Sequence, residues 1–177
     1  MSAEVTLEGP FGGVNAKVAA LRNRTALPAG DGHRDLAEGV WLSSEAGRGS
    51  ALAFDPVDRG FRLRLRDAGR SKWVAFGFGI PVEGLRHCRF LGVRVRAWSA
   101  DFYSCRPNLR YLRRDGGFVD RFPNDYLLSS GGLHDQMAFI EVDEHLVGDA
   151  RAAEVNLFFQ GNAFDIEFEL IEALQIL

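Results

Sequence analysis

Seven residues on predicted strands combine the side-chain types that recognise a ligand rich in hydroxyl groups. They are Arg94, Arg96, Trp98, Asn108, Arg110, Asn156 and Gln160. An indole ring covers the apolar face of a pyranose, amides and guanidinium groups bind its hydroxyls, and several arginines suit an acidic sugar. The seven residues form one site only if the fold brings them onto one concave sheet surface. Trp98 is central to this hypothesis, because an outward-facing indole needs a covering loop or a ligand.

A structural role explains the arginines without any ligand. Two predicted strands carry arginine at alternate positions, opposite their apolar residues, and the last predicted strand carries acids in the same way. The basic positions are Arg62, Arg64, Arg66, Arg94 and Arg96, and the acidic ones are Asp165, Glu167 and Glu169. Opposite charges on neighbouring strands pair across a sheet, and each pair contributes roughly 0.2–1 kcal/mol. The charge ladders therefore predict cross-strand ion pairs.

Catalytic motifs are not recognisable in the chain. Glu141, Glu167 and Glu169 are available as the paired carboxylates of a glycosidase, but their spacing singles out no two of them. The histidines show neither HxH nor HExxH spacing, and they are His33, His87, His134 and His145. We therefore expect a non-catalytic protein and keep a polysaccharide-active enzyme as an alternative.

Oxygen ligands for a hard cation occur in the loops of the N-terminal third. They are Asp31, Asp35, Asp55 and Asp58, and their spacing is not that of a calcium-binding loop. Loop aspartates more often cap helices or form turns. We predict no cofactor and leave a structural calcium ion as an alternative.

The C-terminal stretch shows the pattern of a two-stranded β-ribbon. Residues 154–160 lead into a Gly161-Asn162 turn, after which residues 164–170 alternate apolar and charged side chains. Alternation with a period of two is typical of a strand with one buried and one solvated face. The same pattern recurs in residues 61–66 and 92–98. The sequence therefore predicts an all-β fold, an antiparallel β-sandwich.

The alternation also predicts which side chains are buried. The predicted inward-facing residues are Phe61, Leu63, Leu65, Val93, Val95, Ala97, Leu109, Tyr111, Leu157, Phe159, Ile166, Phe168 and Leu170. Trp41 and Trp73 lie in apolar runs and are predicted to be core residues. Residues 73–80 are interpreted as a strand covered on both faces. Residues 122–126 either pack under a loop or form the rim of a binding surface.

The N-terminal segment, residues 1–38, is predicted to be irregular. Within it, Val14, Val18 and Leu21 have the spacing of a short helix face, and residues 25–38 have the Pro and Gly content of a long loop. Residues 1–4 lack the basic start and apolar run of a signal peptide. We therefore expect a cytoplasmic protein, or a secreted one if a leader has been removed.

Length and composition are those of a single globular domain spanning residues 1–177. The chain has 46% hydrophobic and 25% charged residues. A net charge of −3 argues against nucleic acid as a partner, and no apolar stretch reaches the length of a membrane span. Cys88 and Cys105 are expected to be free thiols. The oligomeric state is left open.

Three segments resemble the strands of galactose-binding-like jelly rolls, in particular carbohydrate-binding modules with that fold. Residues 84–97 resemble the central strand, residues 137–142 the strand before the final pair, and residues 155–174 the closing strands. The resemblance covers roughly residues 61–177 and implies a β-sandwich of jelly-roll type. It also implies a glycan partner, bound on the end loops or across the concave sheet face, and many members hold a structural calcium ion.

The pattern and the resemblance together favour a non-catalytic carbohydrate-binding module. Its expected ligand is an oligosaccharide or an acidic polysaccharide. A protein-interaction or assembly module, in which the outward charge ladder is an interface, is a further alternative.

Overall fold

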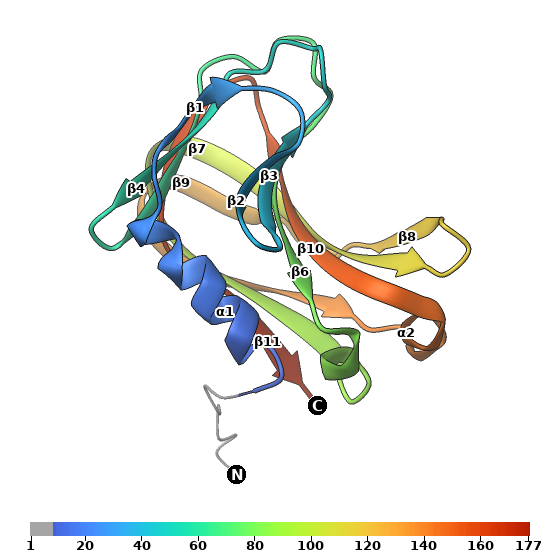
Figure 1. Ribbon diagram of the computed structural model, residues 1–177. Coiled ribbons are helices and arrows are strands. Elements are labelled where there is room, and N and C mark those ends of the chain that lie inside the picture. The colour runs from blue at the N-terminus through green and yellow to red at the C-terminus, as the bar shows by residue number, and fades with distance from the viewer. Residues whose placement is uncertain (1–8) are drawn as a thin grey trace.

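The computed structural model describes residues 9–177, which form two packed layers of antiparallel strands (Figure 1). The strands are β1 (Leu27–Gly30), β2 (Arg34–Ala37), β3 (Val40–Ser44), β4 (Leu52–Val57), β5 (Gly60–Leu65), β6 (Val74–Ile80), β7 (Phe90–Arg113), β8 (Phe118–Arg121), β9 (Leu127–Glu141), β10 (Ala150–Gln160) and β11 (Phe164–Ile176). The α-helices are α1 (Gly12–Ala19) and α2 (Glu144–Asp149), and 3-10 turns occupy Ala20–Asn23 and Val82–Leu85. The predicted antiparallel β-sandwich is confirmed.

The long strand β7 belongs to both layers. Its first half pairs with β11 as far as Ser99, and its second half pairs with β10 from Ser104 onward. The first layer runs β1-β4-β5-β11-β7, with β9 also paired to β7. The second layer runs β7-β10-β6-β3-β2, with β8 also paired to β7. The pairing of β7 with β9 shifts register between Ser99 and Phe102, and such irregularities bend strands.

A single hydrophobic core lies between the layers and includes a cluster of phenylalanines. Phe61 of β5 stacks on Phe76 of β6 and on Phe168 of β11, with ring centroids 5.2 and 5.3 Å apart. Of the residues predicted to face inward, all but the half-buried Leu170 are buried. The β11–β7 pairing shifts register between Phe168 and Leu170, which explains this one departure from alternation.

The N-terminal segment is more regular than predicted. Val14, Val18 and Leu21 are buried by α1 and the 3-10 turn that follows, as their spacing indicated. Residues 25–38 are not a loop, since they contain β1 and β2. The Arg34 guanidinium donates hydrogen bonds to the carbonyl oxygens of Pro28 and Leu52, and these long-range contacts support the short strands despite their Pro and Gly content. Residues 1–4, which bear on the signal-peptide argument, lie outside the described residues.

Cys88 and Cys105 are buried free thiols, as predicted. Burial raises the pKa of the Cys105 thiol to about 12, so this side chain behaves as a small apolar residue at neutral pH. Within the described chain, no helix has the length and apolarity needed to cross a membrane.

Removing the Phe168 ring should destabilise the fold strongly, because this ring contacts core phenylalanines from both layers, Phe61 of β5 and Phe159 of β10. We expect Phe168→Ala to lower the free energy of unfolding by about 3–5 kcal/mol, measured by urea denaturation. Phe139→Ala is the matched control, since Phe139 is 52% exposed on β9. A similar loss in both variants would contradict the assigned core.

Candidate functional site

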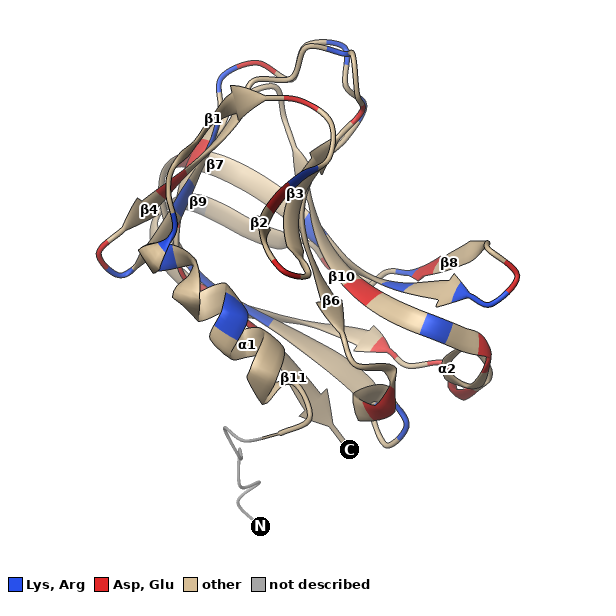
Figure 2. Cartoon of the chain, in the orientation of Figure 1, with Lys and Arg blue, Asp and Glu red and all other residues tan. Residues whose placement is uncertain are grey.

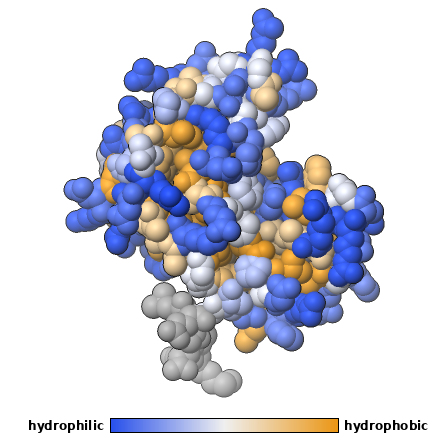
Figure 3. All heavy atoms as spheres, viewed as in Figure 1, coloured by the Kyte–Doolittle hydropathy of each residue, from blue (hydrophilic) through white to orange (hydrophobic). Residues whose placement is uncertain are grey.

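A cleft of about 870 Å³ lies on the outer face of the second layer. Its floor is formed by side chains of β3, β6, β10 and the second half of β7 that point away from the core. The space-filling view shows apolar surface beside hydrophilic surface on the side of the molecule that carries β8 and β10 (Figure 3).

Small residues on β6 make this face hollow. Ala75 lines the cleft, and Gly77 and Gly79 lie on the same face of the strand, whereas Phe76 and Phe78, which alternate with them, fill the core. A Cβ atom at Gly77 would collide with Nε1 of Trp41 and Oδ1 of Asn156. The absence of a side chain at Gly77 therefore allows the Trp41 indole and the Asn156 amide to approach the floor from the two neighbouring strands.

Aromatic rings flank the floor on the β3–β6 side. Trp41 of β3 and Trp73, which precedes β6, both line the cleft, and Trp73 is 37% exposed. The Trp73 ring lies edge-on to Phe158 of β10, with centroids 6.2 Å apart. An exposed indole beside a polar floor provides a flat apolar surface on which a ring-shaped ligand can stack.

On the opposite side, arginines are packed against aromatic rings. The Arg106 guanidinium lies 4.7 Å from the Phe122 ring centroid and 5.1 Å from that of Tyr126, and it donates a hydrogen bond to the Pro123 carbonyl. The Arg110 guanidinium lies 4.1 Å from the Phe118 ring centroid. These cation–π contacts hold the arginines and the rings in place.

Arg110 is also paired with a carboxylate. Its Nε and one terminal nitrogen donate to the two oxygens of Asp120, at 2.7 and 2.8 Å. These hydrogen bonds raise the pKa of Arg110 and neutralise its charge locally. Arg110 is therefore a fixed, paired group and does not act as a free cation in the cleft.

Glu154 of β10 lies beside Arg110 and opposite Gly79 in the strand register. Partial burial raises the pKa of its carboxyl, and the positive charge of Arg110 and the neighbouring Asn156 amide offset this effect only in part. The cleft thus contains a half-buried carboxylate whose charge is incompletely compensated.

Two asparagines form the next row of the floor. Nδ2 of Asn156 donates to Oδ1 of Asn108 at 3.2 Å, and both residues are buried. Asn156 lines the cleft, whereas Asn108 lies beneath it. Nδ2 of Asn108 has no hydrogen-bond partner among the described residues.

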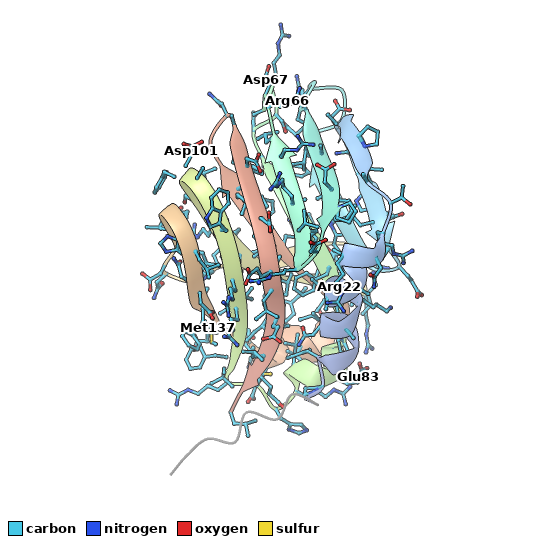
Figure 4. The ribbon with its side chains drawn as sticks, turned by 90° about the vertical axis from the view of Figure 1, so that its left-hand side faces the viewer. Arg22, Arg66, Asp67, Glu83, Asp101 and Met137 are labelled. Carbon is cyan, nitrogen blue, oxygen red and sulfur yellow. The ribbon has the colours of Figure 1, made fainter. Side chains whose placement is uncertain are left out.

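The structure divides the seven residues predicted to bind ligand between two surfaces. Arg110, Asn156 and Gln160 line the cleft, with Asn108 under its floor. The other three lie on the outer face of the first layer, which faces the viewer in Figure 4, and they are Arg94, Arg96 and Trp98. The seven residues therefore do not share one concave surface, because β7 passes from one layer to the other between the two groups.

On the first layer, the arginines form cross-strand ion pairs, as predicted, with acids of the predicted ladder and also with Asp135, which was not among them. Arg94 makes a two-point contact with Asp135 at 2.9 and 2.7 Å, and Arg96 lies 3.0 Å from Glu169. Arg62 pairs with Glu167 at 2.9 Å. Basic and acidic segments are accordingly interspersed on the strands (Figure 2). Trp98 stands beside this network and is 45% exposed.

Sequence reasoning missed most of the aromatic residues of the cleft. Trp41 and Trp73 were predicted to be core residues, but both line the cleft. The interpretation of this region as a strand covered on both faces is confirmed for Val74–Ile80, where every residue except Gly79 is buried. For residues 122–126, the structure favours the rim interpretation, since Phe122 and Tyr126 line the cleft. The alternation of Ala75, Gly77 and Gly79 with large apolar residues was the signal of a hollow sheet face.

Of the groups considered for catalysis or metal binding, His33 and Asp35 line the cleft, 3.2 Å apart, and the carboxylates proposed for a glycosidase lie elsewhere. Glu167 and Glu169 are paired with arginines on the first layer, and Glu141 lies at the end of β9. Asp55 accepts two hydrogen bonds from Arg64. Across residues 9–177, no group of three or more His, Cys, Asp or Glu side chains is arranged to hold a metal ion.

The comparisons with known proteins identify the fold. The sequence matches no protein-family model and no curated protein. The structure is similar to a CBM4 carbohydrate-binding module, with a TM-score of 0.57, 13% identity, and 77% of this chain and 87% of that chain covered. It is also similar to a family 11 carbohydrate-binding module from Clostridium thermocellum in complex with a β-1,3-1,4-mixed-linked tetrasaccharide, with a TM-score of 0.52, 9% identity, and coverage of 86% and 98%.

A third similar structure belongs to a larger protein. Xylanase10C from Cellvibrio japonicus, a mutant in complex with xylopentaose, aligns with a TM-score of 0.51 and 12% identity over 82% of this chain. This chain spans 28% of the length of that xylanase. The protein therefore has the jelly-roll β-sandwich fold of carbohydrate-binding modules, as the sequence resemblance implied.

The raised pKa of Glu154 predicts how one substitution changes stability with pH. The folded protein keeps the Glu154 proton to a higher pH than the unfolded chain, so ionisation of this group opposes folding as the pH rises through its folded-state pKa. We expect Glu154→Gln to raise the free energy of unfolding at pH 7 and to have little effect below the ordinary pKa of 4.5. Urea denaturation at pH 4 and pH 7 measures both values.

Glu167→Gln is the control for this measurement. It removes a glutamate that pairs with Arg62 on the first layer, so it should not stabilise the protein at pH 7. A gain from Glu154→Gln of equal size at both pH values would show that burial of the charge is not its cause.

Proposed function

We propose that this protein is a non-catalytic carbohydrate-binding module that holds an oligosaccharide segment in the cleft of the second layer. The observation that carries the proposal is the combination of exposed Trp73 and the Trp41 ring with a hollow, polar floor. Sugar rings present both an apolar face and hydroxyl groups, and this arrangement offers a partner to each.

The described side chains divide these roles among themselves. Trp41 and Trp73 provide flat surfaces for stacking, and the Phe158 ring supports Trp73. Glu154 accepts hydrogen bonds from sugar hydroxyls, and the Asn156 and Gln160 amides both donate and accept them. The cleft is formed by strand side chains and packed rings, so little ordering is needed when a ligand binds.

The charge arrangement favours a neutral sugar over an acidic one. Arg110 is paired with Asp120, Arg106 is packed between two rings, and Glu154 adds negative charge to the floor. An acidic sugar bound to Arg110 would have to displace Asp120, and Lys72 would be a further lining cation available to it. The similar structures support a neutral ligand, since the family 11 module is in complex with a mixed-linked tetrasaccharide, and the xylanase, of which this chain spans 28%, is in complex with xylopentaose.

Truncation of Trp73, the more exposed indole of the cleft, should abolish most of the glycan binding. We expect Trp73→Ala to weaken the affinity for xylan or mixed-linked β-glucan, whichever binds, by at least about tenfold, because removing a central Trp commonly costs more than about 1.4 kcal/mol. Isothermal titration calorimetry measures the change. Trp98→Ala is the matched control and should bind as the unmodified protein does. Loss of binding in Trp98→Ala alone would transfer the site to the first layer.

A second measurement tests the charge argument. We expect neutral xylan or mixed-linked β-glucan to bind, and polygalacturonate, which carries a carboxylate on each sugar, not to bind at low ionic strength. Preference for polygalacturonate would contradict the neutral ligand, and Asp120→Asn would then be expected to increase that affinity by freeing Arg110.

A further inference from the structure

A second groove of about 490 Å³ adjoins the cleft. Tyr126 and Gln160 line both spaces, so they stand at the boundary between them. The remaining residues of this groove are Phe102, Ser104, Asn124, Asp125 and Leu128. None of the roles described above uses this groove.

The groove continues the same face of the sheet. Phe102, Ser104 and Arg106 alternate along β7 with the buried Tyr103 and Cys105, so they point to the cleft side. Ser104 is opposite Gln160 of β10 and Leu128 of β9 in the strand register, which places these three side chains in one row. From Phe102 to Arg110, this face of β7 extends about 26 Å at the usual strand rise of about 3.3 Å per residue.

The chemistry of the groove repeats that of the cleft. Phe102 is 65% exposed and Leu128 is 48% exposed, so both present apolar surface to solvent. The Asn124, Asp125 and Gln160 side chains provide hydrogen-bonding groups beside that surface. The Arg106 guanidinium of the cleft is packed over the ring of Tyr126, which lines both spaces.

The position of Phe102 follows from the bend of β7. The register of β7 against β9 shifts between Ser99 and Phe102, where Gly131 and Gly132 of β9 have φ values of 101° and 87°. A Cβ atom at Gly131 would lie 3.2 Å from the Ala100 carbonyl oxygen, so the close approach of the two strands at this bend favours glycine. Such irregularities re-aim the side chains next to them.

We propose that this groove is an additional subsite for the same glycan chain, with Phe102 as its stacking surface, so that the protein selects long chains over short oligosaccharides. The proposal rests on the proposed function of the cleft. A short oligosaccharide occupies the cleft alone, whereas a longer one extends past Tyr126 onto Phe102.

The test compares oligosaccharides of increasing length. Xylo-oligosaccharides and mixed-linked β-gluco-oligosaccharides, from disaccharide to octasaccharide, are titrated into the unmodified protein and into Phe102→Ala by calorimetry. We expect affinity to increase with length in the unmodified protein, and Phe102→Ala to lower the affinity for the longest binding chains by about fivefold while leaving the shortest unchanged. Phe139→Ala, which removes a ring of similar exposure from the first layer, should match the unmodified protein at every length.

A readout on the unmodified protein does not depend on any substitution. In amide NMR spectra, a long oligosaccharide should shift the signals of Ser104 and Leu128 in addition to those of Asn156, and a short one should shift Asn156 alone. Binding of short and long chains with equal affinity, or an equal loss for all lengths in Phe102→Ala, would overturn the second subsite and leave the cleft standing. Failure of every chain to bind the unmodified protein would overturn the cleft function as well.

Discussion

The antiparallel pairing of β7 with strands of both layers is the constraint on which the other features depend. Its first half is bonded to β11 and its second half to β10, so it cannot slide along one partner without breaking its ladder with the other. A slip of one residue would also turn every side chain to the opposite face and bury the arginines. The register therefore fixes Arg110 in the cleft and Arg94 in the ion-pair network at the same time.

The hollow of the cleft results from a division of volume across β6. Phe76 and Phe78 fill the core on one face of β6, while Ala75, Gly77 and Gly79 occupy little volume on the other face. Glycine in a strand interior weakens the strand, since it adds backbone freedom and no packing. β6 tolerates this because it is paired on both sides, with β3 and β10, and because its core face is fully buried.

The sequence predicted the local pattern of the sheets well, because the period of two is a property of each strand by itself. The Arg94–Asp135 ion pair could not be predicted in this way. The two residues are 41 positions apart, and they pair because β7 and β9 are neighbours in the sheet. Residues 92–98 were interpreted as a strand of their own, although β7 has two halves and these residues lie in the first of them. The strand changes layer at the bend near Phe102, and no periodic sequence pattern marks this bend. The residues predicted to form one site therefore lie on two surfaces. Trp41 and Trp73 were misassigned because apolar neighbours do not reveal on which side of a strand an indole lies.

The electrostatics of the cleft support the proposal of a ligand that only donates and accepts hydrogen bonds. Asp120 already satisfies Arg110, and aromatic rings cover the flat faces of Arg106 and Arg110, so neither guanidinium gains much by capturing an anion. Glu154 is different, because burial has weakened its hydration and its neighbours compensate its charge only in part. A hydroxyl group that donates to this carboxylate replaces a lost water contact at little cost, whereas a second carboxylate would add repulsion in a partly desolvated site. The burial that makes the Glu154 carboxylate costly for the folded protein is therefore also the reason for proposing it as an acceptor for a neutral sugar.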